Sequence, residues 1–93
     1  MAVRVVRCRL RERMKAIKAI VERHLPEHWL IDHGDELRVL TPTGRVDMVV
    51  TLYPNVDGVV VDVYEKSLEE TALAVGREIE ETLGVRVTCY LRW

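Results

Sequence analysis

The sequence has few cysteines, few amides and no long apolar run, and each shortage narrows what the protein can be. It contains no Phe and no Gln, one Asn, one Ser and two cysteines, Cys8 and Cys89, with no CxxC spacing. This cysteine pattern argues against a zinc site. It favours two free thiols; a disulfide stays open as an alternative, because hyperthermophile proteins can form one inside the cell. Scarce amides beside many charged residues are typical of proteins built for high temperature.

Signatures of membrane insertion and catalysis are missing as well. No apolar run approaches the ~18 residues that a membrane helix needs. Seven Arg and Lys among residues 1–20 leave no apolar core for a signal peptide. All five glycines are isolated, so no phosphate-binding loop is present. His24 and His28 flank Pro26 and therefore cannot form a metal pair on one helix face. We expect a cytoplasmic, non-enzymatic protein without metal or cofactor.

Charged residues are abundant, and they are unevenly distributed. Residues 1–26 contain eight Arg and Lys against two Asp and Glu, whereas residues 27–93 contain six against thirteen. This asymmetry indicates either an anionic partner or a basic helix that lies beside an acidic one in the same fold. A secondary basic stripe suited to contacts with a nucleic-acid backbone consists of Arg4, Arg7, Arg11, Lys15 and Lys18.

Hydrophobic periodicity predicts two helices in a single domain, residues 1–93. Apolar residues recur every three or four positions as far as Leu25, and Pro26 ends this first helix. We expect it to begin near residue 10, with residues 2–9 open between helix and strand. The second helix is expected to begin at a capping box formed by Ser67 and Glu70 and to run to about residue 83.

Alternating and apolar runs, separated by turn residues, predict strands at residues 29–32, 36–41, 45–53, 59–65 and 85–93. The order is therefore helix, three or four strands, helix, strand. Short turns between the middle strands favour an antiparallel meander, within an antiparallel or mixed sheet of four or five strands. We predict an α+β domain of two layers, with both helices on one face of the sheet. Gly76, in the middle of the second helix, is expected to allow a close approach.

Strand alternation assigns side chains to the two faces of this sheet. One face is almost purely apolar and should lie beneath the helices; Val46 and Met48 are assigned to it. The other face receives Asp47 and Asp62, which we expect to lie close together on neighbouring strands. It also receives three tyrosines and four arginines, namely Tyr53, Tyr64, Tyr90, Arg38, Arg45, Arg86 and Arg92.

A sheet face with aromatic and guanidinium groups is suited to single-stranded DNA or RNA. The three tyrosines would stack on bases, each stack being worth ~1–3 kcal/mol, and the four arginines would contact phosphates. The alternative hypothesis is a homodimeric or higher homo-oligomeric protein, with a protein-interaction or chaperone-like role. In that case the same face is a buried subunit interface, because Tyr and Arg are also favoured in protein interfaces.

With this element order and with aromatic and basic residues on the sheet, the Arg- and Val-rich domain resembles the ThermoDBP-related single-stranded DNA-binding proteins of thermophilic archaea. The resemblance is architectural and covers about residues 10–93. It implies binding of single strands with little sequence preference, often by an oligomer. No family motif matches residue by residue, so the resemblance assigns no site residue.

Overall fold

Two main helices and five strands make up the fold. A computed structural model describes the backbone of residues 2–53 and 58–93 and the side chains of residues 10–53 and 58–93. Residues 2–9 have a helical backbone, which resolves the alternative left open by their sequence. The elements are α1 (Ala2–His24), β1 (Trp29–Asp32), β2 (Glu36–Leu40), β3 (Val46–Tyr53), β4 (Gly58–Val63), the short 3₁₀ helix η1 (Lys66–Leu68), α2 (Glu69–Leu83) and β5 (Arg86–Leu91).

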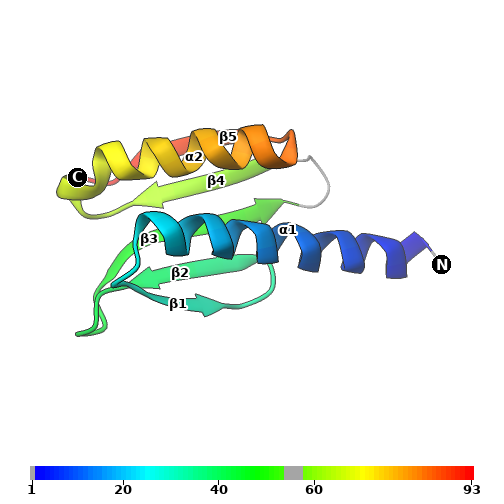
Figure 1. The fold of residues 1–93 in the computed structure, drawn as a ribbon, viewed down its shortest axis with the longest axis horizontal. Coiled ribbons are helices and arrows are strands. Elements are labelled where there is room, and N and C mark those ends of the chain that lie inside the picture. The colour runs from blue at the N-terminus through cyan, green and yellow to red at the C-terminus, as the bar shows by residue number, and fades with distance from the viewer. Residues whose placement is uncertain (1, 54–57) are drawn as a thin grey trace.

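The strands form one sheet in their order along the chain, β1-β2-β3-β4-β5. Each neighbouring pair among β1 to β4 is antiparallel, because short connections join these strands. β5 is parallel to β4, since α2 carries the chain back along the sheet between them. Both helices lie on the same face (Figure 1). The prediction of a two-layer α+β fold with both helices on one face is therefore confirmed.

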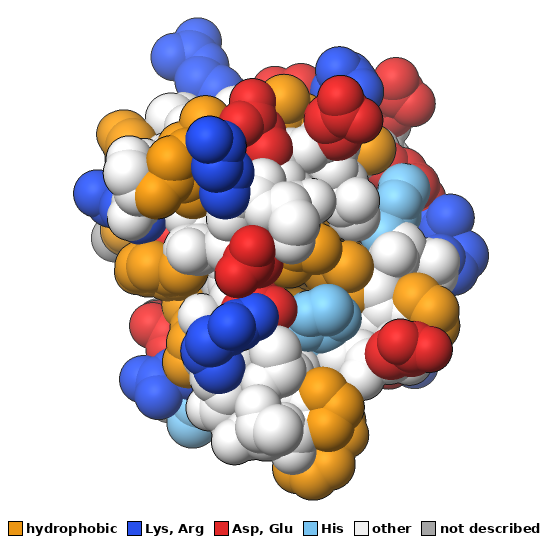
Figure 2. Space-filling view, turned by 90° about the vertical axis from the view of Figure 1, so that its left-hand side faces the viewer, with side chains coloured by type: hydrophobic (Ala, Val, Ile, Leu, Met, Phe, Trp, Pro, Cys, Tyr) orange, Lys and Arg blue, Asp and Glu red, His pale blue; other side chains and the backbone are white. Residues whose placement is uncertain are grey.

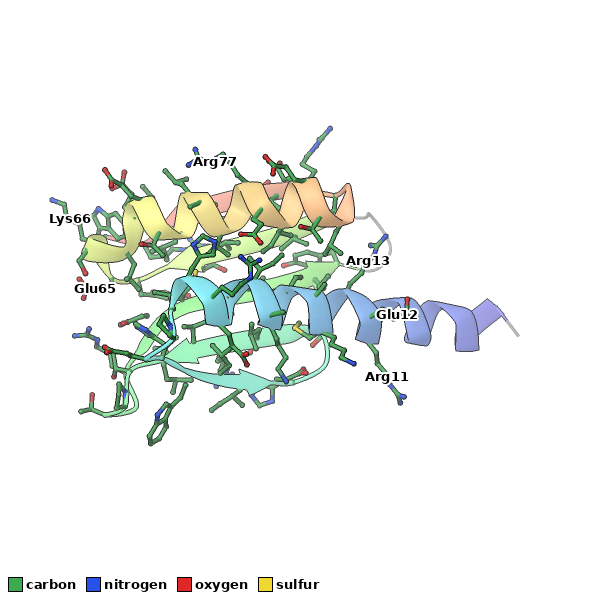
Figure 3. The ribbon with its side chains drawn as sticks, viewed as in Figure 1. Arg11, Glu12, Arg13, Glu65, Lys66 and Arg77 are labelled. Carbon is green, nitrogen blue, oxygen red and sulfur yellow. The ribbon has the colours of Figure 1, made fainter. Side chains whose placement is uncertain are left out.

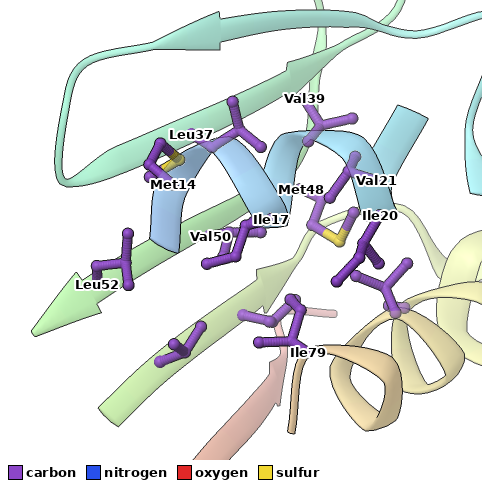
Figure 4. Close-up of a cluster of buried hydrophobic side chains, with 14 of the residues drawn as sticks. Met14, Ile17, Ile20, Val21, Leu37, Val39, Met48, Val50, Leu52 and Ile79 are labelled. Atoms are coloured by element: carbon purple, nitrogen blue, oxygen red, sulfur yellow. The ribbon is translucent and has the colours of Figure 1, made fainter. Parts of the chain in front are cut away.

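The core lies between the two helices and the sheet face that they cover. Met14, Ile17 and Val21 of α1 are almost completely buried, and so is Ile79 of α2 (Figure 4). Their removal from water is the main force that holds the two layers together. The strands supply the opposite side of this core with Leu37, Val39, Met48, Val50, Leu52, Val59, Val61 and Val63.

The C-terminal end of α1 is tied to α2 by charged side chains. Glu78 of α2 forms an ion pair with Arg23 and a hydrogen bond with His24, whose Nε2 lies 2.8 Å from Oε1 of Glu78. This part of the structure matches one sequence expectation, a basic helix lying beside an acidic one.

A β-bulge in β3 overturns two predicted side-chain placements. The register between β2 and β3 shifts after Val39, so that Leu40 pairs with Val46 and Asp47 becomes the extra residue. Val46 consequently lines a groove together with Val49, on the uncovered side of the sheet. Asp47 is turned inward and is 3% exposed. The assignment of Val46 to the covered face and of Asp47 to the opposite one was wrong.

The start of α2 also differs from the prediction. The helix begins at Glu69 without a side-chain cap, after the 3₁₀ turn η1. The hydroxyl and the backbone N–H of Ser67 both donate to Oε2 of Glu65, at 2.9 and 3.1 Å. A carboxylate is a stronger acceptor than a hydroxyl, so Glu65 caps this turn. The predicted capping box of Ser67 and Glu70 was therefore wrong.

Gly76 lets α2 pack closely on β5, as expected. A Cβ atom at this position would lie 3.3 Å from both Sγ of Cys89 and Cγ1 of Val87, which is tighter than ordinary contact. Gly84 ends α2 in the left-handed conformation with φ of 65°, the usual stop signal at a helix C-terminus.

Candidate functional site

No helix or strand in the described part of the chain covers the face of the sheet opposite the helices. We call this face the open face. Alternation along the strands and the strand register identify its members. Tyr64 and Arg92 directly follow β4 and β5 and extend the same alternation. The open face consists of Trp29, Ile31, Glu36, Arg38, Leu40, Val46, Val49, Thr51, Tyr53, Val60, Asp62, Tyr64, Arg86, Thr88, Tyr90 and Arg92.

Large apolar and aromatic side chains are exposed on the open face. Trp29 is 60% exposed, Ile31 is 42% exposed, and all three tyrosines are nearly half exposed. An uncovered antiparallel sheet face is usually polar. Exposed apolar patches on small proteins generally mark contacts with a partner or a ligand. Trp29 and Ile31 belong to this patch although sequence analysis did not assign them to it; alternation in the short strand β1 was the signal available for finding them.

The tyrosines occupy separate places on the open face. Tyr64 borders a groove of about 440 Å³ that also contains Arg38 and Val49. Tyr53 borders a second hollow of about 570 Å³ together with Arg86. Tyr90 neighbours the first groove, because it pairs in register with Asp62, one of its lining residues. The structure thus brings the three tyrosines to one face, with Tyr64 and Tyr90 both beside Arg92 and Tyr53 at the opposite end of the β3–β4 pair.

The arginines of the open face are largely neutralised by carboxylates of the same chain. Nε of Arg38 lies 2.8 Å from Oε1 of Glu36, and Nε of Arg92 lies 2.7 Å from Oδ1 of Asp62. Arg86 makes no ion pair or hydrogen bond with any residue in the described part of the chain. The open face therefore carries both signs of charge in nearly equal amounts.

Arg92, Tyr90 and Asp62 form a compact group. The guanidinium carbon of Arg92 lies 4.9 Å from the centroid of the Tyr90 ring, in cation–π geometry. The hydrogen bond to Asp62 raises the pKa of Arg92 above its usual value, and the charge of Asp62 adds to this rise. The Arg92 guanidinium thus stays charged and already occupies one face of the Tyr90 ring.

Arg45, the fourth predicted arginine, belongs to a different cluster at one end of the sheet. Its Nε lies 2.9 Å from Oδ1 of Asp47, and its second amino nitrogen lies 3.3 Å from Glu65. His28 Nε2 lies 3.0 Å from the other Asp47 oxygen. Figure 2 shows this end of the molecule, where histidine, basic and acidic side chains surround hydrophobic ones. Sequence analysis missed this cluster because the bulge at Asp47 creates it.

Hydrogen bonding sets the charge states within this end cluster. The hydrogen bond to Asp47 raises the pKa of Arg45. The bonds from the backbone and the hydroxyl of Ser67 lower the pKa of Glu65. Each carboxylate of this cluster thus has a cation or a hydrogen-bond donor beside it, which stabilises the structure at this end of the sheet.

The secondary basic stripe lies on α1. Arg11, Lys15 and Lys18 line a groove of about 320 Å³ beside Asp32 and Gly34 of the β1–β2 turn. Lys18 lies 3.8 Å from Asp32. The side chains of the two other predicted members of the stripe lie outside the described residues; these are Arg4 and Arg7.

Other site chemistry is sparse in the described part of the chain. No group of three His, Cys, Asp or Glu within it has a geometry that could hold a metal ion. Within those residues, no helix is both long and apolar enough to cross a bilayer. Cys89 is a free, half-buried thiol, and burial raises its pKa; Cys8 lies outside the described side chains.

Comparison of the chain with protein-family models, with curated proteins and with solved structures found no match. The resemblance to the ThermoDBP-related proteins therefore stays a prediction.

Proposed function

We propose that the protein is a non-enzymatic binding protein that acts as a homodimer, in which the open faces of two copies pack against each other. The observation that carries this proposal is the middle row of residues across the sheet. In register from β1 to β5 these are Ile31, Arg38, Val49, Asp62 and Tyr90. The row has an apolar residue at its centre and an apolar or aromatic residue at each end. A positive charge lies on one side of the centre, at Arg38, and a negative charge on the other side, at Asp62.

This row is self-complementary about one particular two-fold axis. This axis runs parallel to β3, between the two sheets and above Val49. Rotation about it brings β4 of the second copy over β2 of the first. Arg38 then faces Asp62 of the second copy, and Ile31 faces its Tyr90. An axis perpendicular to the strands would instead place Asp62 over Asp62. Since like charges in an interface are strongly disfavoured, the charge pattern selects the axis along β3.

The area and composition of the open face also support a protein partner. Five strands spaced by ~4.8 Å, each about six residues long, give a footprint of roughly 20 Å by 24 Å. Projecting side chains enlarge its accessible surface towards the ~800 Å² that each partner buries in a standard interface. Trp29 and the tyrosines are of the kind that dominates binding energy in protein interfaces. A small domain also gains stability when such a face is buried.

The charge balance of the open face disfavours a nucleic-acid partner. Binding of a phosphate backbone depends on excess positive charge, whereas Glu36 and Asp62 lie directly beside two of the predicted phosphate-binding arginines. Releasing those arginines would cost little, because exposed ion pairs contribute ~0–1 kcal/mol. The carboxylates would nevertheless remain and repel phosphates. Base stacking on the tyrosines stays a prediction and is one outcome of the test below.

The test measures the mass of the protein by light scattering and sedimentation over a range of concentrations. We expect a concentration-dependent dimer that Arg38→Asp and Asp62→Arg each weaken, since each substitution creates two like-charge contacts across the interface. Combining both substitutions should restore most of the dimer. Arg77→Asp on α2 is the matched control, because Arg77 is exposed outside the open face, and it should leave the mass unchanged.

Circular dichroism of each variant checks that the fold is retained. A wild-type protein that stays monomeric at every concentration reached would overturn the proposal, and so would a double variant no more dimeric than the single ones. The nucleic-acid alternative would be supported if a monomer bound labelled single strands and the Tyr53→Ala/Tyr64→Ala/Tyr90→Ala variant lost that binding.

A further inference from the structure

The groove beside α1 gathers positive charge that the fold leaves uncompensated. Arg11, Lys15 and Lys18 are separated by four and three positions, so they lie on one side of the helix. Arg11 and Lys15 form no ion pair with any residue that the structure describes. Lys18 has only Asp32 nearby, at 3.8 Å, with both side chains more than one-third exposed. The groove thus holds three cations against one carboxylate.

The spacing of these three cations lowers the stability of the helix itself. Like charges three and four positions apart on a helix repel each other. On the open face, Arg38 and Arg92 are paired with carboxylates, whereas Arg86 has no partner among the described residues. The groove differs from the open face because its two unpaired cations, Arg11 and Lys15, lie one helical turn apart on the same side of α1.

We propose that this groove binds the phosphate backbone of a nucleic acid without reading its sequence. The three cations follow each other along the helix over ~10 Å, at 1.5 Å per residue, instead of converging on one point. Such a line suits a polymer with regularly repeated negative charges better than a single phosphate. Phosphate contacts made by Lys and Arg position a strand but carry no sequence information.

The groove and the open face are independent of each other. α1 covers the opposite side of the sheet (Figure 1), so packing of two open faces leaves both grooves accessible. Nucleic-acid binding by the groove can therefore succeed or fail separately from dimer formation. Asp32 is the one carboxylate among the residues that line the groove, and the three cations outnumber it.

The test is fluorescence anisotropy of a labelled single-stranded and a labelled duplex oligonucleotide, titrated with the full chain at several salt concentrations. Three contacts predict a slope of log K against log salt of about −2 to −3. The Lys15→Gln/Lys18→Gln variant should bind more weakly and reduce the magnitude of that slope by about 2. Its mass, measured by light scattering, should equal that of the wild type.

The matched control is Lys66→Gln/Arg77→Gln, which removes the same charge at two exposed positions. Figure 3 shows Lys66 at one end of the molecule and Arg77 on the outer side of α2, both far from Arg11. This control should bind like the wild type. The proposal is overturned by absence of binding at low salt, by equal losses in both variants, or by competition from polyglutamate as strong as that from unlabelled oligonucleotide.

Discussion

At the scale of single residues, Asp47 is the polar group on which one end of the sheet depends. Its two carboxylate oxygens accept hydrogen bonds from His28 and Arg45 while its side chain is almost fully buried. Buried carboxylates are tolerated only when they are paired in this way. The contacts of Asp47 fix the loop after α1 to the start of β3.

Removing this carboxylate should be costly. We expect Asp47→Ala to lower the free energy of unfolding by about 2–3 kcal/mol, because hydrogen bonds to a charged group are lost and their donors are left without an acceptor. Urea denaturation with an unchanged m-value would measure this loss. Asp35→Ala is the control; Asp35 is exposed, and its replacement should change stability by less than about 0.5 kcal/mol. Equal effects of the two substitutions would contradict the role given to Asp47.

The sequence alone could assign the residues of a strand to one face of the sheet. It could predict their ion-pair partners only when both residues belong to the same strand. Arg38 and Glu36 are two positions apart, so alternation alone puts them on one face where they can pair. Arg92 and Asp62 are 30 positions apart, and they meet only because β5 runs parallel to β4. Alternation had assigned Arg92 and Asp62 to the same face, but their pairing could not be predicted from the sequence.

At the scale of elements, the periodic segments were the most predictable. The second helix and all five strands lie close to where hydrophobic patterning placed them, because each must bury one apolar side. The first helix begins at Ala2, whereas a start near residue 10 was expected. The bulge in β3 was not predictable, since Val46, Met48 and Val50 alternate without interruption in the sequence. Only the pairing with β2 shows that one residue is extra. The 3₁₀ turn before α2 likewise depends on Glu65, which the sequence pattern assigned to a strand.

The contact between α2 and β5 gives a prediction at this scale. Gly76→Ala should lower the free energy of unfolding by about 1 kcal/mol, although Ala favours a helix by about the same amount. The new methyl group meets Cys89 and Val87 at 3.3 Å, and overpacking of this kind costs ~1–3 kcal/mol. Thermal or urea unfolding measures the effect.

A second substitution tests the physical reason. Replacing Cys89 by Ala removes the sulfur atom that crowds the new Cβ, so the loss caused by Gly76→Ala should be smaller in a Cys89→Ala background. Such non-additivity is expected between residues in contact. If Gly76→Ala stabilises the protein in both backgrounds, the close packing of α2 on β5 does not limit that position.

At the scale of the whole molecule, the fold shows where the basic residues of the N-terminal part of the sequence lie. Four basic residues of α1 with described side chains lie in two different environments. Arg23 pairs with the acidic side of α2, whereas Arg11, Lys15 and Lys18 surround the groove on the helix-bearing side. The neighbouring acidic helix accounts for Arg23, and the anionic partner that we propose would account for the cations of the groove.

Dimer formation and groove binding together predict a dependence on strand length. Two copies joined through their open faces carry one groove each on their outer sides. A long strand can engage both grooves, and the second contact is then favoured by its high effective concentration. A short strand can engage only one. Asp62→Arg, which should weaken the dimer, is therefore expected to reduce affinity for long strands while leaving affinity for short strands nearly unchanged.

This substitution separates avidity from electrostatics, because it adds positive charge. A purely electrostatic effect would strengthen binding of strands of every length. Anisotropy titrations with a series of single strands of increasing length, at fixed moderate salt, measure the effect. If Asp62→Arg weakens binding of long strands, the loss must come from the missing second groove. If binding is unchanged or stronger at every length, a single copy is the binding unit, and the groove acts without the dimer.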